Sequence, residues 1–162
     1  MKLKLVTTIF LVISGIILNG ANGKQDFDRP GFYAALASQS LDSVNAGLEA
    51  VSKSSISTKE AFEGSLLMKK AGLVQNVRSK YNLFKSGHKK LDDVIARDSK
   101  NAELRFLRLM IQENSPRILN YRNEIDEDNK IIKSAYKSLP PIVQKAVVDY
   151  SKKSKVLKTA FL

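Results

Sequence analysis

The chain has 162 residues, enough for one domain, and carries a formal net charge of +11. It is 43% hydrophobic and 27% charged, which favours a folded globular protein over a disordered one. Cysteine is absent, so disulfides, thiolate metal sites and a cysteine nucleophile are excluded. The single histidine, His88, excludes a histidine-rich zinc or iron site. We therefore expect neither a metal nor another cofactor.

Residues 1–23 have the pattern of a secretory signal peptide. Lys2 and Lys4 precede an apolar run over residues 5–18, which is shorter than the roughly 20 apolar residues of a membrane span. Small residues follow, and they predict cleavage after Ala21 or Gly23. The alternative is an uncleaved membrane anchor. We expect cleavage near Gly23 and a soluble, exported protein, either periplasmic or extracellular.

The positive charge remains after such cleavage. Loss of Lys2 and Lys4 lowers the formal charge from +11 to +9. An exported basic protein meets anionic lipids, polysaccharides and acidic protein surfaces. The chain lacks the mixture of aromatic and basic residues that is typical of single-strand binding, so nucleic acid is an unlikely partner. The simplest interpretation of the charge is solubility.

The first predicted elements follow a polar leader over residues 24–30. From Gly31 to Val51, apolar residues recur at spacings of three and four, which predicts one helix. Residues 52–58 are rich in serine and threonine and interrupt the pattern. Ser57 and Glu60 match a capping box at the start of a second helix, and Gly72 fits its C-terminal end.

Two further helices are predicted over residues 77–97 and 101–114, joined by a turn. Ser115 and Pro116 are typical of a new helix start. The segment from Ile118 to Leu139 fits either one long helix or two helices divided near residues 126–129. A last helix is predicted over residues 141–153, before a basic tail over residues 154–162.

No segment of useful length alternates as a β-strand does. The predicted fold class is therefore all-α, with a single domain over residues 31–153. About six helices joined by short turns indicate an antiparallel bundle or a short stack of helical hairpins.

The stretch from Phe84 to Ile111, which contains LDDVIARDSKNAELRFLRL, resembles the joint between two tetratricopeptide-type repeats. The matching positions are Ala96, Asp98, Asn101, Ala102 and Glu103, whereas Ser99 stands where that family often has proline. The tryptophan and glycine-tyrosine signatures of the repeat are missing. The chain also resembles small exported bacterial helical proteins without an assigned activity. The first resemblance implies a helical scaffold that binds a partner, and it carries over no catalytic residue.

A line of polar residues interrupts the most apolar predicted helix. Asn101, Arg105, Arg108 and Gln112 follow one another at spacings that place them on one face. The line could face solvent, with the arginine stems covering apolar surface.

Two other interpretations of this line remain open. The arginines could pair internally with carboxylates such as Glu124 or Asp126, since an unpaired buried charge is prohibitively unfavourable. They could instead line a groove and bind a carboxylate or phosphate through the planar guanidinium group. We take Asn101, Arg105, Arg108 and Gln112 as the candidate site for a partner.

His88 lies on the apolar stripe of the third predicted helix. Its simplest interpretation is a core residue with one hydrogen bond. The alternative is a small envelope enzyme that uses His88 with carboxylates, although no sequence motif supplies a nucleophile or acid. The neighbouring Gly87 predicts a close approach of two helices.

Two further segments of the chain are rich in charge. The acidic stretch over residues 123–130 lacks the glycine of a calcium loop and has Lys130 at a ligand position. Its acids fit a helix N-terminus or pairing with Arg117 and Arg122. The C-terminus combines several lysines with apolar residues, so a peripheral binder of anionic membrane or polysaccharide is an alternative to a solvated last helix.

These patterns favour an exported, soluble helical interaction or scaffold protein. The expected partner is a protein or peptide, with an anionic envelope surface as the second choice. No enzyme motif is found, so we do not expect catalysis.

Overall fold

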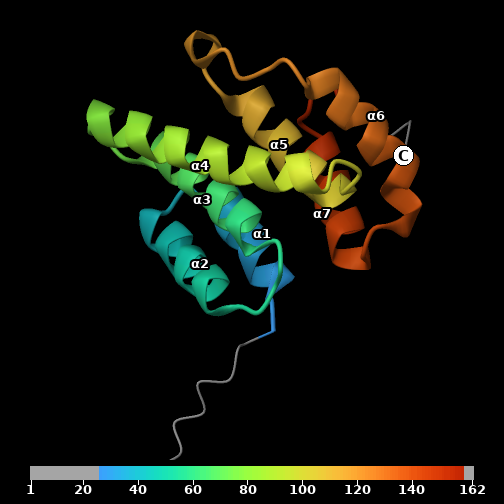
Figure 1. The fold of residues 1–162 in the computed structure, drawn as a ribbon, viewed down its shortest axis with the longest axis horizontal. Helices are drawn as coiled ribbons and strands as arrows, with labels where there is room; N and C mark the ends of the chain where they lie inside the picture. Colours follow the sequence, from blue (N-terminus) through green and yellow to red (C-terminus); the bar gives the residue numbers. More distant parts are fainter. Residues whose placement is uncertain (1–25, 159–162) are drawn as a thin grey trace, which may run out of the picture.

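The computed structural model describes residues 26–158, and within them the regular structure is helical (Figure 1). The predicted all-α class is confirmed, with seven α-helices and two short 3₁₀ turns in this range. The predicted signal peptide and the end of the tail, residues 159–162, lie outside the described residues. The α-helices are α1 (Arg29–Ala37), α2 (Leu41–Lys53), α3 (Lys59–Leu73), α4 (Val77–Arg97), α5 (Ala102–Asn114), α6 (Ile125–Ala135) and α7 (Pro141–Ser151).

The first predicted helix is divided into α1 and α2. The hydroxyl of Ser40 accepts a hydrogen bond from the backbone N–H of Ser43 and so caps a new helix. Helix α1 begins inside the predicted polar leader. The side chain of Asp28 accepts from the N–H of Gly31, and Pro30 fits the first turn.

The predicted capping box of the next helix does not form. Thr58 occupies the N-cap position of α3 without a side-chain hydrogen bond. Glu60 instead pairs with Arg97 on α4, with 2.9 Å between oxygen and nitrogen. Gly72 lies inside α3, one residue before its end at Leu73. With Thr58 as the N-cap, Glu60 is the second residue of α3, so the spacing of a capping box is lost.

The segment after α5 contains one α-helix, α6, between two short 3₁₀ turns, so it is neither one long helix nor two helices divided near residues 126–129. Pro116 starts only a single 3₁₀ turn, η1 (Arg117–Leu119), which ends at Asn120 in the left-handed conformation. Helix α6 then begins before the predicted break near residues 126–129 and continues into a second turn, η2 (Tyr136–Ser138). The predicted helix over residues 77–97 has the bounds of α4.

Helices α3 and α4 approach each other closely at two glycines. A β-carbon on Gly64 or on Gly87 would collide with the backbone carbonyl oxygen of the other. The expectation that Gly87 permits a close helix approach is confirmed. Only glycine on both helices lets the two backbones touch here.

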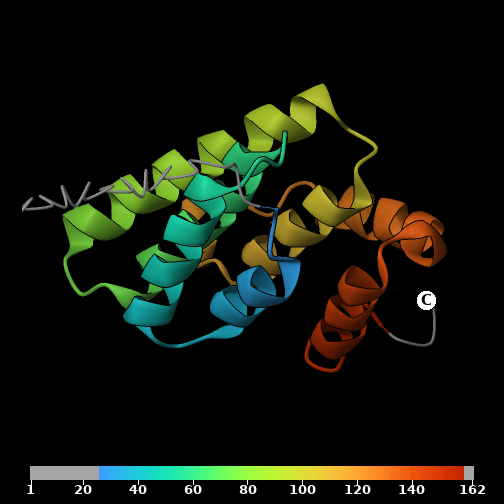
Figure 2. The same cartoon turned by 90° about the horizontal axis from the view of Figure 1, so that it is seen from below.

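Helix α5 lies at the centre of the domain. Its residues 102–109 are all buried. Leu104 and Leu107 pack with the first four helices, whereas Phe106 and Leu109 pack with α6 and α7. Figure 2 shows α1 and α2 on one side of α5 and α7 on another. One helix therefore joins two apolar clusters into a single core.

The packed domain extends past its predicted end at residue 153. Leu157 is fully buried in the cluster around α7. Ser154 donates its hydroxyl to the carboxylate of Glu113 on α5, at 2.5 Å. The backbone N–H of Lys155 donates to the same carboxylate at 2.8 Å. Leu157 is therefore not available to a membrane surface.

Candidate functional site

The predicted polar line on α5 is closed by α6. Arg105 and Arg108 are only 5% and 6% exposed, and Asp128 on α6 is fully buried. Arg108 donates through Nε and Nη2 to the two oxygens of Asp128, both at 2.8 Å. Arg105 donates to the same carboxylate at 2.9 Å and also to the carbonyl of Ser99. One buried acid therefore neutralises two arginines in part.

Further acids complete this network. Glu127 lies 3.2 Å from Arg105, and Asp92 on α4 lies 3.6 Å from Arg108. Burial alone would lower the pKa of Arg108, but the hydrogen bonds and charge of Asp128, with the charge of Asp92, raise it. Arg108 is therefore held in its charged form.

The two ends of the line are also occupied within the chain. Asn101 is the N-cap of α5, where its side chain accepts from the N–H of Leu104 at 3.2 Å. Gln112 is fully buried and donates to Glu124 at 2.7 Å.

This geometry matches the internal-pairing interpretation of the line, with one difference. The main acid is Asp128, whereas the sequence suggested Glu124 or Asp126. Asp128 faces α5, and Asp126 is exposed one half-turn earlier on α6. Binding of a partner through this line stays a prediction, and the structure does not favour it because the donors are engaged internally.

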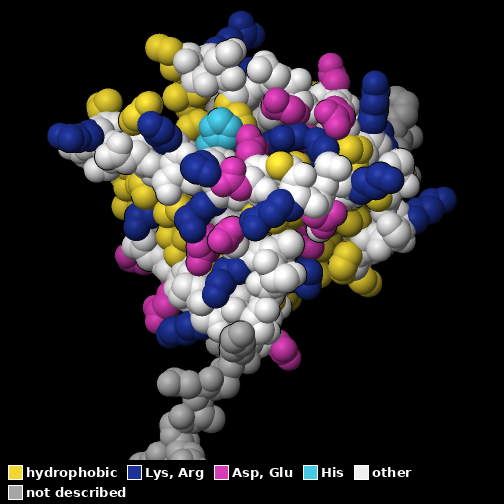
Figure 3. Space-filling model, in the orientation of Figure 1, with side chains coloured by type: hydrophobic (Ala, Val, Ile, Leu, Met, Phe, Trp, Pro, Cys, Tyr) yellow, Lys and Arg dark blue, Asp and Glu magenta, His cyan; other side chains and the backbone are white. Residues whose placement is uncertain are grey.

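His88 lies at the surface and not in the core as predicted. Its side chain is 41% exposed, and Nε2 lies 2.7 Å from the carboxylate of Asp92 one turn away. Its ring centroid is 4.2 Å from that of Tyr121. Tyr121 also donates its hydroxyl to Asp92. Figure 3 shows the histidine at the surface near acidic side chains. These contacts join His88 to a carboxylate and a phenol, and the envelope-enzyme alternative stays a prediction.

The acidic segment over residues 123–130 contributes carboxylates to α5. Within residues 26–158, no group of three or more histidine, aspartate or glutamate side chains is placed to hold a metal ion. Arg122, which was expected to pair with these acids, donates instead to the backbone carbonyl of Glu113. Three acids do occupy the first turn of α6, as the predicted preference for a helix N-terminus requires.

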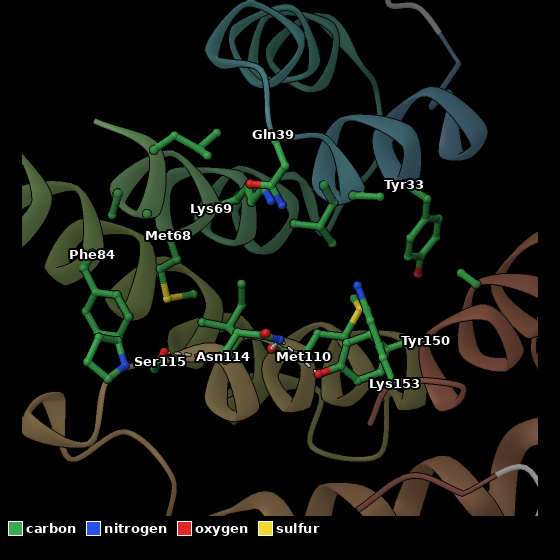
Figure 4. A pocket seen from close by; sticks show the side chains of 18 of the residues that line it. Tyr33, Gln39, Met68, Lys69, Phe84, Met110, Asn114, Ser115, Tyr150 and Lys153 are labelled. Carbon is green, nitrogen blue, oxygen red and sulfur yellow. Dashed lines mark hydrogen bonds between the residues drawn. The ribbon is translucent and has the colours of Figure 1, made fainter. Parts of the chain in front are cut away.

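A large groove lies on another side of α5. Its volume is about 1080 Å³, and its lining comes from α1, α3, α4, α5, α7 and the turn η1. Figure 4 shows Met68 and Phe84 on one side of this groove and Met110, Asn114 and Tyr150 on another. The volume slightly exceeds the range of about 300–1,000 Å³ that is typical of ligand sites.

Large apolar side chains stand exposed where the groove opens. Ile118 in η1 is 92% exposed, Val77 at the start of α4 is 78% exposed, and Tyr81 is 57% exposed. All three line the groove. Apolar surface left in water is unfavourable, and such residues clustered at one opening are typical of an interaction site.

The charged residues in the groove are mostly basic. They are Lys69, Lys80, Lys145, Lys153 and a single acid, Asp149. Asp149 accepts from Lys145 at 2.6 Å and from Lys152 at 2.7 Å. These two hydrogen bonds lower the pKa of Asp149 to about 2. The one acid in the described lining is therefore already occupied.

Sequence reasoning did not find this groove. Val77 and Tyr81 were assigned to the apolar stripe of the third predicted helix, which was expected to face the core. The available signal was length, since a helix of 21 residues extends beyond a partner of 15 residues. The positions that face no partner on the same stripe are then exposed.

Comparisons with protein-family models, with curated proteins and with solved structures found no match to this chain. The resemblance to tetratricopeptide repeats therefore stays a prediction. Within residues 26–158, no helix combines the length and the apolar character that crossing a membrane requires.

Proposed function

We propose that this protein is an interaction protein whose groove binds an amphipathic helix of a protein partner. The observation that carries the proposal is the cluster of exposed apolar side chains, Val77, Tyr81 and Ile118, at the opening of a large groove. Covering these side chains removes apolar surface from water, which is the main driving force of association.

The form of the groove favours a polypeptide segment. Its exposed rim leaves it open to solvent, and several helices supply its walls. An amphipathic helix lays its apolar face into such a groove. Met68 and Met110 lie in the walls, and methionine adapts its shape to different apolar partners.

Export is a separate part of the proposal and rests on residues 1–23 alone. Their basic start, apolar run and small residues support a secretory signal peptide. The partner is then met in the periplasm or outside the cell, and no catalytic activity is needed for the role.

The test is binding of a designed, fluorescently labelled amphipathic helix, with leucine on one face and glutamate and glutamine on the other. Fluorescence anisotropy measures its affinity for the purified protein and for Val77→Asp/Ile118→Asp. We expect the double variant to bind at least tenfold more weakly, because it loses two apolar contacts of about 1.5–3 kcal/mol each at full burial.

Leu41→Asp is the matched control, since Leu41 is an exposed apolar residue outside the groove. It should bind the peptide like the wild type. Equal affinity of the wild type and the groove variant, or no binding by either protein, would overturn the proposal.

A further inference from the structure

Lys69 is a cation without an ion-pair partner in the wall of the groove. It lies on α3 and is partly buried, and within residues 26–158 no carboxylate pairs with it. Burial lowers the pKa of Lys69, and the positive charge of Lys153 lowers it further. An ammonium group placed against apolar walls and another cation is unfavourable unless a negative charge compensates it.

Lys153 is the second cation of this pair. It follows α7, and its ammonium nitrogen lies 5.3 Å from the centre of the Tyr150 ring. This is a cation–π contact and not an ion pair. Figure 4 shows Lys69 on α3 and Lys153 in the turn after α7, both among the side chains that line the cavity.

Other lysines near these two have acidic partners. Lys145 and Lys152 share Asp149, and Lys90 on α4 pairs with Glu63 at 3.0 Å. Asp149 is the single acid of the described groove lining, and Lys145 and Lys152 already occupy it. Lys69 and Lys153 have no carboxylate partner among the described residues.

We propose that Lys69 and Lys153 form an anion subsite that receives a carboxylate from the polar face of the bound helix. This inference rests on the proposed function and names the chemistry of the partner, a helix with an apolar face and an acidic face. Two ammonium groups can contact one carboxylate from two directions. Apolar walls lower the local dielectric constant and so strengthen the attraction.

The experiment uses three peptides with the same leucine face and with glutamate, glutamine or lysine on the polar face. We expect the glutamate peptide to bind most tightly and the lysine peptide most weakly. Lys69→Met and Lys153→Met should each lower the affinity for the glutamate peptide roughly tenfold and leave the affinity for the glutamine peptide nearly unchanged. Such a double-mutant cycle isolates the charge interaction from the loss of the lysine stem.

Lys70→Met is the matched control. Lys70 is the next residue on α3, is also partly buried, and does not line the groove. It should leave the affinities of all three peptides unchanged.

Proton linkage gives a second readout. A bound carboxylate opposes the effects that lower the pKa of Lys69, so binding should be accompanied by proton uptake in the alkaline range. The affinity for the glutamate peptide should therefore fall as the pH rises through that pKa. Lys69→Met should remove most of this dependence.

The outcomes separate the subsite from the groove. If the glutamate and glutamine peptides bind equally and neither Lys69→Met nor Lys153→Met changes this, the anion subsite is overturned. The helix-binding groove still stands in that case if Val77→Asp/Ile118→Asp weakens binding. If that double variant also binds the peptides like the wild type, the helix-binding groove is overturned as well. Binding of dodecanoate that depends on Lys69, with no peptide bound, would assign the subsite to a fatty acid and reject a helix as occupant.

Discussion

Two sides of α5 differ in a way that reverses their expected roles. The side with Arg105 and Arg108 is covered by α6 and neutralised by the buried Asp128. Another side, near Met110 and Ile111, opens onto a groove with exposed apolar neighbours. The charged side is closed within the domain, whereas the apolar side is the one open to solvent.

This contrast shows that residue type alone does not decide which surface is free. Guanidinium groups can be buried where a carboxylate on the next helix meets their geometry. Apolar side chains remain exposed where no helix of the described domain covers them. Whether a side chain is exposed depends on whether another helix packs against it.

The largest expected effect comes from removing the shared acid on the closed side. Asp128→Asn would leave two buried arginines without their main counter-charge, and the free energy of unfolding should fall by about 3–5 kcal/mol. Urea denaturation followed by circular dichroism measures the change. Glu127→Gln is the control, because Glu127 is 62% exposed and its pair with Arg105 should contribute less than about 1 kcal/mol. A small effect of Asp128→Asn would mean that the line on α5 is open to water.

The second-largest effect is expected at the glycine contact between α3 and α4. Gly87→Ala places a methyl group against the backbone of Gly64, and overpacking of this kind destabilises by about 1–3 kcal/mol. Gly72→Ala is the matched control on α3, where an added methyl group meets open space. It should stabilise the protein by about 0.5–1 kcal/mol, because alanine favours the helix. The same denaturation experiment compares both variants, and similar values for the two would contradict the close crossing.

A smaller effect on folding is expected at the open side. Ile118→Asp should change the free energy of unfolding by less than about 0.5 kcal/mol, because the side chain is 92% exposed. The same variant should weaken peptide binding. A large loss of stability would show that Ile118 packs against the domain and that the groove is narrower at this point.

The smallest effect is a pH dependence at Lys69. Its pKa is lower in the folded protein than its usual value of 10.5, so the unfolded chain binds more protons between the two values. This group's contribution to stability therefore rises with pH across that window. As the pH rises, the stability of the wild type should therefore increase slightly relative to that of Lys69→Met. Thermal unfolding of both proteins at several alkaline pH values measures this difference in stability. No change in the difference would mean that Lys69 is fully solvated.

The sequence predicted the helical elements well where periodicity and caps agreed. The helix over residues 77–97 and the start of α5 after Asn101 follow from such agreement. The capping box of Ser57 did not form because α3 begins after Thr58, which moves Glu60 to the second position of the helix, and Glu60 pairs with Arg97. Local signals of this kind compete with long-range contacts that a sequence pattern does not contain.

The line of polar residues on α5 could be predicted from the sequence, but its burial under α6 could not. The spacing of Arg105 and Arg108 placed them on one face, and pairing with the next helix was one of three interpretations. The choice among these depended on the rotation of α6, which brings Asp128 toward α5. The groove was not predicted because its walls come from helices far apart in the chain, and their meeting depends on tertiary packing.

The glycine contact between α3 and α4 has a mechanical consequence. Val77 lies ten residues before Gly87, so the arm of α4 from the crossing to the groove opening is about 15 Å long. A rotation of about 10° at the crossing then displaces Val77 by roughly 2–3 Å. A change of the crossing angle at Gly87 would therefore alter the width of the groove at Val77. The contact between Gly64 and Gly87 shares no residue with the ion pairs between α5 and α6.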